Sequence, residues 1–155
     1  MWLTDSFLDY LQYERNYSEE TIKSYREDLR QFEEFARGEI GDSAPSEVKA
    51  ELVREWIVSL MDRGYTSTSI NRKLSSLRSF YKFLLRKGEV AVNPLQKITG
   101  PKNKKPLPAF LRESDMDRLL DEVDFGEGFK GCRDHMIIEM FYATGVRLSE
   151  LIGLD

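Results

Sequence analysis

The residues best suited to chemistry lie between positions 68 and 87, where long cations alternate with small hydroxyl side chains. At about 100° per residue, one side of a helix over this range collects Thr68, Asn71, Arg72, Ser75, Arg78, Ser79, Lys82 and Arg86. Serine and threonine let a helix backbone approach phosphates, arginine and lysine neutralise charge, and arginine or asparagine can read base edges. This side therefore predicts contact with nucleic acid. The simplest alternative is a solvated helix face.

The distribution of charge along the chain favours the nucleic-acid interpretation. Residues 1–64 carry 8 Lys/Arg and 15 Asp/Glu, residues 65–112 carry 11 and one (Glu89), and residues 113–155 carry 4 and 11. The net charge of −4 therefore divides into −7, +10 and −7. A solvated helix face usually mixes glutamate with lysine, yet no acidic residue lies between Asp62 and Glu89. One basic surface on an acidic protein indicates a polyanionic partner.

Two neighbouring segments carry weaker signals of the same kind. A helix that begins after Ser18 has hydroxyl and basic side chains in its first turns, before glutamates follow: Thr21, Lys23, Ser24 and Arg26. Residues 93–110 combine lysines with prolines, which a helix interior does not tolerate, so we expect an extended basic linker there. The linker cations expected to contact the same partner are Lys102, Lys104 and Lys105.

The remaining residue types exclude several other classes of site. The single cysteine, Cys132, excludes an internal disulfide framework and a cysteine-based zinc site, and the single histidine, His135, excludes a multi-histidine metal site. We therefore expect no metal and no cofactor. No apolar run approaches about 18 residues, and the N-terminus shows no secretory signal. A membrane is therefore not an expected partner, and the expected location is the cytoplasm.

Apolar residues at helical spacing predict the elements that position these side chains. Four helices are expected in the first 88 residues: one to about Glu14, one from Ser18 to Arg37, one capped by Ser46 that ends at Arg63, and one capped by Thr66 or Ser67 that ends at Lys87. Three of them end with a basic residue followed by glycine, as a left-handed C-cap favours. No segment alternates with strand periodicity. We therefore expect an all-α, four-helix domain over residues 1–92.

Residues 111–155 predict the first helices of a second domain. We expect a helix capped by Ser114, a loop marked by Gly126, Gly128 and Gly131, a helix from about Arg133 and a last helix from Arg147. A unit of this length rarely buries enough apolar surface to be stable alone. We therefore expect the chain to be the front part of a longer protein, truncated within this domain.

Several segments resemble one family of DNA-processing enzymes. Residues 143–151 read ATGVRLSEL and resemble the first catalytic box of the tyrosine recombinases, also called phage-type integrases. The N-terminal half is similar to the same family over residues 18–29 (SEETIKSYREDL) and 71–84 (NRKLSSLRSFYKFL), and then at Asn93-Pro94 and Pro101-Lys102. Helical domain, basic linker and box stand in the family's order, so the resemblance covers essentially the whole chain. It is strongest to the Xer subgroup.

The resemblance implies that the helical unit is a SAM-like core-binding domain that grips one side of a DNA duplex. In this family the second and fourth helices enter the major groove, and the matching positions here are Thr21, Lys23, Ser24, Ser69, Asn71, Arg72, Ser75 and Ser79. The linker then crosses the DNA toward the catalytic domain. The implied partner is double-stranded DNA in the nucleoid. The resemblance implies that the full-length recombinase binds it as a tetramer, and we expect this fragment to be a monomer.

The resemblance also assigns Arg147 as the first catalytic arginine and Glu150 as the acidic residue that helps hold the active site. Strand cleavage creates a phosphorane-like transition state with extra negative charge on its non-bridging oxygens. A guanidinium offers these oxygens a planar fork of donors and stays charged at any working pH. Arg147 also opens a helix, whose positive end favours phosphate. The simplest alternative is an ordinary surface arginine near a helix start.

The rest of the family's catalytic set has no counterpart here. The family's lysine, His-x-x-Arg box, further His or Trp and tyrosine nucleophile all follow the first box, whereas the seven tyrosines and His135 precede Arg147. Tyr25 and Tyr81 lie on apolar stripes, which indicates packing. We therefore expect this chain to be inactive alone, and the full-length parent to cleave and rejoin DNA through a 3′-phosphotyrosyl intermediate.

Other interpretations stay open at this point. A naturally truncated, non-catalytic DNA-binding module would occupy recombination sites without cutting them. A helical protein–protein adaptor would use Trp2 and Trp56 in an exposed apolar patch. For a full-length recombinase, the choice between resolution of chromosome dimers and integration of a mobile element also stays open.

Overall fold

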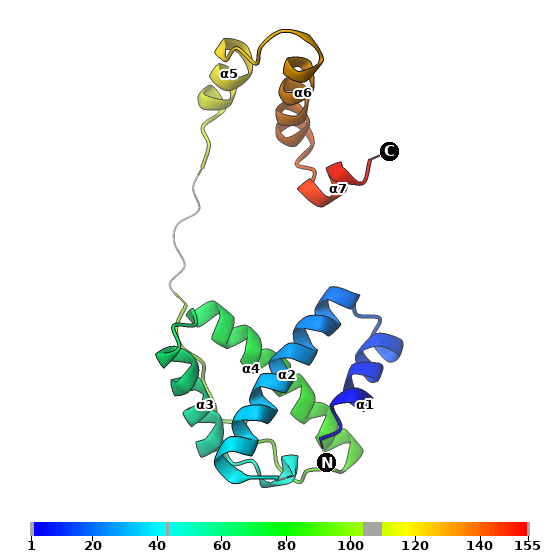
Figure 1. The fold of residues 1–155 in the computed structure, drawn as a ribbon, viewed down its shortest axis with the longest axis vertical. Coiled ribbons are helices and arrows are strands. Elements are labelled where there is room, and N and C mark those ends of the chain that lie inside the picture. Colours follow the sequence, from blue (N-terminus) through cyan, green and yellow to red (C-terminus); the bar gives the residue numbers. More distant parts are fainter. Residues whose placement is uncertain (1, 43, 104–109, 155) are drawn as a thin grey trace. The chain divides into compact units, whose positions relative to one another are not determined.

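A computed structural model describes residues 2–42, 44–103 and 110–154, and these ranges contain helices and no strand (Figure 1). The chain divides into two compact units, residues 1–105 and 106–155. The first contains α1 (Thr4–Asp9), the π-helical turn η1 (Tyr10–Glu14), α2 (Glu19–Ile40), the 3-10 turn η2 (Pro45–Glu47), α3 (Ala50–Asp62) and α4 (Ser67–Lys87). The second contains α5 (Glu113–Glu122), α6 (Gly128–Thr144) and α7 (Leu148–Ile152). The all-α prediction is confirmed. No helix within the described ranges is both long and apolar enough to span a membrane.

Two of the predicted N-caps are confirmed. The Ser18 hydroxyl accepts a hydrogen bond from the Thr21 amide (3.4 Å), and the Thr66 hydroxyl accepts one from the Ser69 amide (3.2 Å). Each bond satisfies an amide that the first turn of a helix leaves unpaired. These caps fix where α2 and α4, the two helices with the predicted contacts, begin.

The predicted caps at Ser46 and Ser114 are wrong. Ser46 lies inside η2, which Pro45 begins, and the chain then extends through the buried Val48 before α3 starts at Ala50. Ser114 lies within the first turn of α5, whose N-cap position is Arg112 without a side-chain cap. In both places a serine close to a helix start was available, but the backbone turns into the helix elsewhere.

The end of α2 and the start of α6 differ from the predicted boundaries, and both differences involve glycines. Helix α2 continues through Gly38 and ends at Gly41, which has a φ of 70°. Helix α6 begins at Gly128, before the expected start at Arg133, and includes the buried Gly131. A Cβ atom on Gly131 would collide with the backbone of Gly126. This glycine therefore permits close packing of the preceding loop on α6, rather than marking a loop itself.

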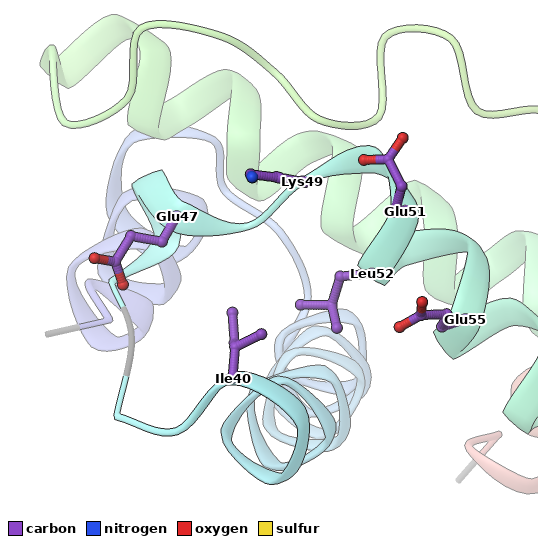
Figure 2. Close-up of a pocket in the computed structure, with 6 residues that line it drawn as sticks. All are labelled: Ile40, Glu47, Lys49, Glu51, Leu52 and Glu55. Carbon is purple, nitrogen blue, oxygen red and sulfur yellow. The ribbon is translucent and has the colours of Figure 1, made fainter.

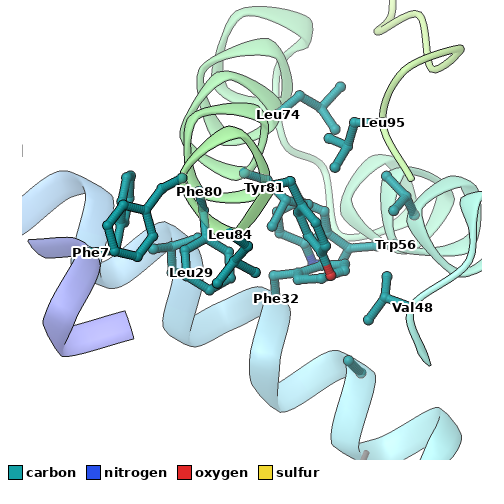
Figure 3. Packing of buried hydrophobic residues seen from close by; sticks show 14 of the residues in the cluster. Phe7, Leu29, Phe32, Val48, Trp56, Leu74, Phe80, Tyr81, Leu84 and Leu95 are labelled. Carbon is teal, nitrogen blue, oxygen red and sulfur yellow. The ribbon is translucent and has the colours of Figure 1, made fainter. Parts of the chain in front are cut away.

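The first unit is built around an aromatic core that α2, α3 and α4 share with α1 (Figure 3). The Phe32 and Trp56 rings meet edge to face at 4.9 Å, and Trp2 lies against Phe80 at 6.1 Å. Trp56 is 1% exposed, so it does not form the surface patch that the adaptor interpretation requires. Tyr81 is fully buried, its hydroxyl donates to the Pro45 carbonyl (3.1 Å), and burial raises its pKa. The prediction that Tyr81 serves packing is confirmed.

The first part of the predicted linker packs on α4. Leu95 and Ile98 are buried in the core of the first unit. Arg78 Nη2 donates to the Ile98 carbonyl (2.8 Å), and Asn71 Nδ2 donates to the Pro101 carbonyl (2.8 Å). The segment is irregular, as its prolines predict, yet it is held along its length by side chains of α4.

The second unit has a much smaller core within its described residues. Met116 is its one buried apolar side chain there, and the His135 ring bonds the Leu120 carbonyl (3.1 Å) and meets Phe125 edge to face. Large apolar side chains that remain exposed include Phe110, Phe129, Met136, Leu148 and Ile152. This matches the expectation that residues 111–155 bury little apolar surface.

Candidate nucleic-acid interface

Helices α2 and α4 bring four of the predicted contact residues into one groove. Thr21 and Ser24 from α2, with Arg72 and Ser75 from α4, line a hollow of about 330 Å³, which we call the α2–α4 groove. Its other lining residues are Glu20, Tyr25 and Ser76. Ser24 and Ser75 are exposed, and Thr21 shares a hydrogen bond with Ser18. Small hydroxyl side chains on both walls leave room for a phosphate or a base edge to approach the helix backbones.

Arg72 is held in this groove by a buried carboxylate. Its Nη1 and Nη2 atoms donate to the two oxygens of Asp28 at 2.6 and 2.9 Å, and Asp28 is 1% exposed. Lys73 Nζ donates to Asp28 (3.0 Å) and to Gln31 (2.7 Å), and the Ser76 hydroxyl also donates to Asp28 (2.8 Å). Two cations surround one carboxylate, so the cluster keeps a positive charge, and half of the Arg72 side chain faces solvent. We call this set the Asp28 network.

Sequence reasoning missed the Asp28 network, although a signal was present. Asp28 lies one turn from both Tyr25 and Phe32 on the apolar stripe of α2, and Lys73 lies next to the apolar stripe of α4. Charged residues on stripes that face one another indicate a buried ion pair, because an unpaired buried charge is very costly.

Asn71 and Arg78 contact the protein itself. Besides its bond to Pro101, Asn71 Nδ2 donates to Asn103 Oδ1 (3.0 Å), and Arg78 holds the Ile98 carbonyl. A Cβ on Gly100 would collide with Asn71 Oδ1, so the chain passes very close to this amide. In this structure both side chains fix residues 98–103 on α4.

The other predicted residues are distributed along the two helices and beyond them. Thr68 and Lys102 are exposed, and Ser69 is half-buried with its hydroxyl bonded to Thr66. Ser79 and Lys82 lie further along α4, beside a second hollow. Lys104 and Lys105 lie outside the described residues.

The cations of α2 and α4 differ in how they are paired. On α2, Lys23 pairs with Glu20 (2.7 Å), Arg26 pairs with Asp5 (3.4 Å), and Arg30 pairs with Glu27 and Glu34. Hydrogen bonds from Arg30 and Gln31 lower the pKa of Glu27 to about 2. By contrast, Lys82 and Arg86 of α4 make no ion pair within the described part of the chain. Helix α4 therefore presents the stronger positive potential.

A hollow beside α3 shows the opposite charge pattern (Figure 2). It measures about 450 Å³ and is lined by Ile40, Glu47, Lys49, Glu51, Leu52 and Glu55. Three carboxylates against one ammonium group repel phosphate. The described residues also contain no group of three or more His, Cys, Asp or Glu side chains arranged to hold a metal ion.

Arg147 and Glu150 form a local pair at the start of α7. The Arg147 amide donates to Glu150 Oε2 (2.9 Å), and Arg147 Nη1 donates to Glu150 Oε1 (2.9 Å). These two bonds lower the pKa of Glu150. The Arg147 side chain is 80% exposed, so its remaining donors are open to solvent. Gly145, with a φ of 64°, ends α6 just before this pair.

Comparison with known proteins connects both regions to one family. Residues 4–88, which span α1 to α4, match the phage integrase N-terminal SAM-like domain. The chain belongs to the phage integrase family. This match supports the family resemblance seen in the sequence.

Relatives of this integrase-family chain extend the similarity beyond α4. The tyrosine recombinase XerC of Oceanobacillus iheyensis is 42% identical over 150 residues, which cover 97% of this chain and 48% of that protein. The XerC of Staphylococcus carnosus is 38% identical over 152 residues, covering 98% of this chain and 50% of that protein. The chain thus spans about half the length of the curated relatives it matches.

A solved structure shares the fold. The integrase of transposon Tn1549, solved as residues 82–397 in complex with circular intermediate DNA, matches with a TM-score of 0.70 and 21% identity. The match covers all of this chain and 50% of that one.

Proposed function

We propose that the first unit binds duplex DNA through the α2–α4 groove and the basic side of α4, as the DNA-binding part of a site-specific tyrosine recombinase. The observation that carries this proposal is the charge of α4, where Lys82 and Arg86 make no ion pair with any described residue, next to a groove in which hydroxyl groups lie on both walls. Such a surface attracts phosphates and admits the edge of a duplex. The XerC relatives and the DNA-bound Tn1549 integrase support the same function.

In the full-length protein, Arg147 stabilises the cleavage transition state. A tyrosine hydroxyl from outside residues 1–155 loses its proton as it attacks the scissile phosphorus, and the 5′ oxygen leaves and takes up a proton. A 3′-phosphotyrosyl bond thereby replaces the phosphodiester bond. The Arg147 fork binds the non-bridging oxygens as their charge increases. Glu150 holds one edge of the guanidinium by the bond from Nη1, which orients its other donors. This chemistry uses no cofactor, and we expect it in the nucleoid, by a tetramer of the full-length protein.

The DNA-binding proposal is tested by a carboxylate placed in the groove. Ser75→Glu changes an exposed residue of the α2–α4 groove, and Ser46→Glu, an exposed serine of η2, is the matched control. Ser75→Glu should weaken duplex binding at least tenfold in a fluorescence anisotropy titration, whereas Ser46→Glu should leave it within twofold. Binding by the unchanged chain should also weaken steeply with salt. Salt-independent binding, or equal effects of the two variants, contradicts the proposal.

Variants of Arg72 and Arg78 are poorer tests, because their guanidiniums bond Asp28 and the Ile98 carbonyl within the fold. A second measurement separates binding from cleavage. Incubated with supercoiled plasmid, the 155-residue chain should leave the DNA supercoiled and form no covalent adduct. A protein–DNA adduct would show that one of its seven tyrosines is a nucleophile.

A further inference from the structure

We propose that the first unit holds DNA backbone phosphates in a second hollow, formed by Arg15, Lys82 and Arg86 beside η1. This basic hollow measures about 540 Å³, and its other lining residues are Phe7, Tyr10, Leu11, Tyr17, Ser79 and Leu85. The inference rests on the proposed DNA binding and extends it to residues of α1 and η1. The contact residues that the sequence predicts lie on α2, on α4 and in the linker, so Arg15 at the end of η1 is an addition to them.

The charge of the basic hollow favours a phosphate ligand. Among the residues that the structure describes, three cations line it and no carboxylate does. The hollow in Figure 2 has three carboxylates and one lysine, and another beside α3 is lined by Glu39, Glu55 and Asp62 with Arg54. Because the protein carries more acidic than basic residues, a hollow with cations alone concentrates positive potential at one place.

Contacts at the basic hollow orient the Arg86 side chain and fix the backbone at Arg15, and none of these contacts is with a carboxylate. The Arg86 guanidinium lies 4.8 Å from the centre of the Tyr10 ring, a contact that orients it without neutralising it. The Arg15 amide donates to the Tyr10 carbonyl (3.2 Å) at the end of the π-helical turn. Asn16 then adopts a left-handed conformation (φ 52°), and the Tyr17 amide donates back to the Leu11 carbonyl (3.0 Å). The backbone around Arg15 is thus fixed at the rim.

The basic hollow continues the α2–α4 groove along a single face of α4. Arg72, Ser75, Ser79, Lys82 and Arg86 follow one another at spacings of three and four residues, so they lie in one row. At about 1.5 Å per residue this row is about 21 Å long, which equals the rise of about six base pairs along a duplex axis at about 3.4 Å each. A duplex that meets the groove at Arg72 therefore reaches the basic hollow at Arg86.

The test uses two triple variants of the 155-residue chain with the same change of charge. Arg15→Gln, Lys82→Gln and Arg86→Gln together neutralise the basic hollow. The control combines Lys49→Gln, Arg54→Gln and Arg63→Gln, three cations that lie on α3 or at its two ends and line neither the basic hollow nor the α2–α4 groove. Binding to a 30-bp duplex is titrated at several salt concentrations. The slope of log Kobs against log salt is negative, and each phosphate contact contributes about 0.9 to its magnitude. This magnitude should decrease by about 2 to 3 for the first variant and stay unchanged for the control.

Two further measurements distinguish the loss of a DNA contact from misfolding of the triple variant. Lys82→Gln alone, at an exposed position, should reduce the magnitude of the slope by about 0.9 while the thermal midpoint stays unchanged. Phosphate ethylation interference should show that the first triple variant loses contacts at one end of the footprint and keeps the others. If the unchanged chain binds with a steep salt dependence and both triple variants retain its slope, the basic hollow is not a DNA site and only this inference is overturned. If the unchanged chain does not bind, the proposed function itself fails.

Discussion

Each unit of the chain contains an arginine bound to a carboxylate through its guanidinium, and the two pairs are built differently. Arg72 and Asp28 come from different helices, and Asp28 is buried. Arg147 and Glu150 are three residues apart on an exposed helix start. A buried pair is costly to break, whereas an exposed local pair contributes little to folding. The difference shows that the first arginine is part of the fold, while the second contributes little to it and keeps donors exposed to solvent.

The largest expected effect is on the buried pair. Asp28→Ala leaves Lys73 buried without its carboxylate and should lower the free energy of unfolding by about 3–5 kcal/mol. Urea denaturation measures this loss. Asp28→Asn keeps the shape of the side chain, and adding Lys73→Met to it should recover part of the stability because no buried charge then remains unpaired; Arg72 stays charged but is half exposed to solvent. A loss below about 1 kcal/mol would remove the distinction between the two pairs.

The second effect concerns Arg147 in the full-length protein and should appear in catalysis alone. Arg147→Ala should slow cleavage of a nicked suicide substrate at least about a hundredfold, which corresponds to about 3 kcal/mol. Arg147→Lys should also fail, because an ammonium group keeps the charge but loses the fork. DNA affinity in a gel-shift titration should stay within twofold. Equal losses of binding and cleavage would make Arg147 a docking residue.

A smaller effect tests whether residues 98–103 belong to the first unit. Gly100→Ala should displace the Asn71 amide from the Pro101 carbonyl and lower stability by about 1 kcal/mol. In an Asn71→Ala background the same substitution should cost much less, since the colliding group is gone. A double-mutant cycle by thermal denaturation gives this coupling. Additive losses would show that Asn71 does not hold the segment.

The smallest effect is expected at Glu150. Because its pKa is lowered in the folded state, its contribution is present above the usual carboxylate pKa and is lost as pH falls through the lowered value. Glu150→Gln should leave the thermal midpoint at neutral pH nearly unchanged, since the carboxylate is exposed. In the full-length protein it should slow cleavage less than Arg147→Ala. A large drop in thermal midpoint would place this pair in the same class as Arg72 and Asp28.

Local patterns predicted most of the helices, whereas long-range contacts escaped prediction. Apolar periodicity and the Ser18 and Thr66 caps depend on neighbouring residues, while Arg147 and Glu150 were singled out only by the family resemblance. The bond from Arg72 to Asp28 joins residues 44 positions apart, and that from Asn71 to Pro101 joins residues 30 apart. The helix-face pattern predicted that Arg72 and Asn71 are free to contact DNA, because their partners within the protein lie far away in the sequence.

The two tryptophans and the single cysteine are divided between the units. Trp2 and Trp56 lie in the aromatic core of the first unit, and the exposed Cys132 lies on α6 of the second. Intrinsic fluorescence therefore reports on the first unit alone, while a maleimide dye marks the second unit at one position. The efficiency of energy transfer from the tryptophans to an acceptor on Cys132 depends on the distance between the units. A change in this distance can therefore be followed as DNA is added, without introducing a new cysteine.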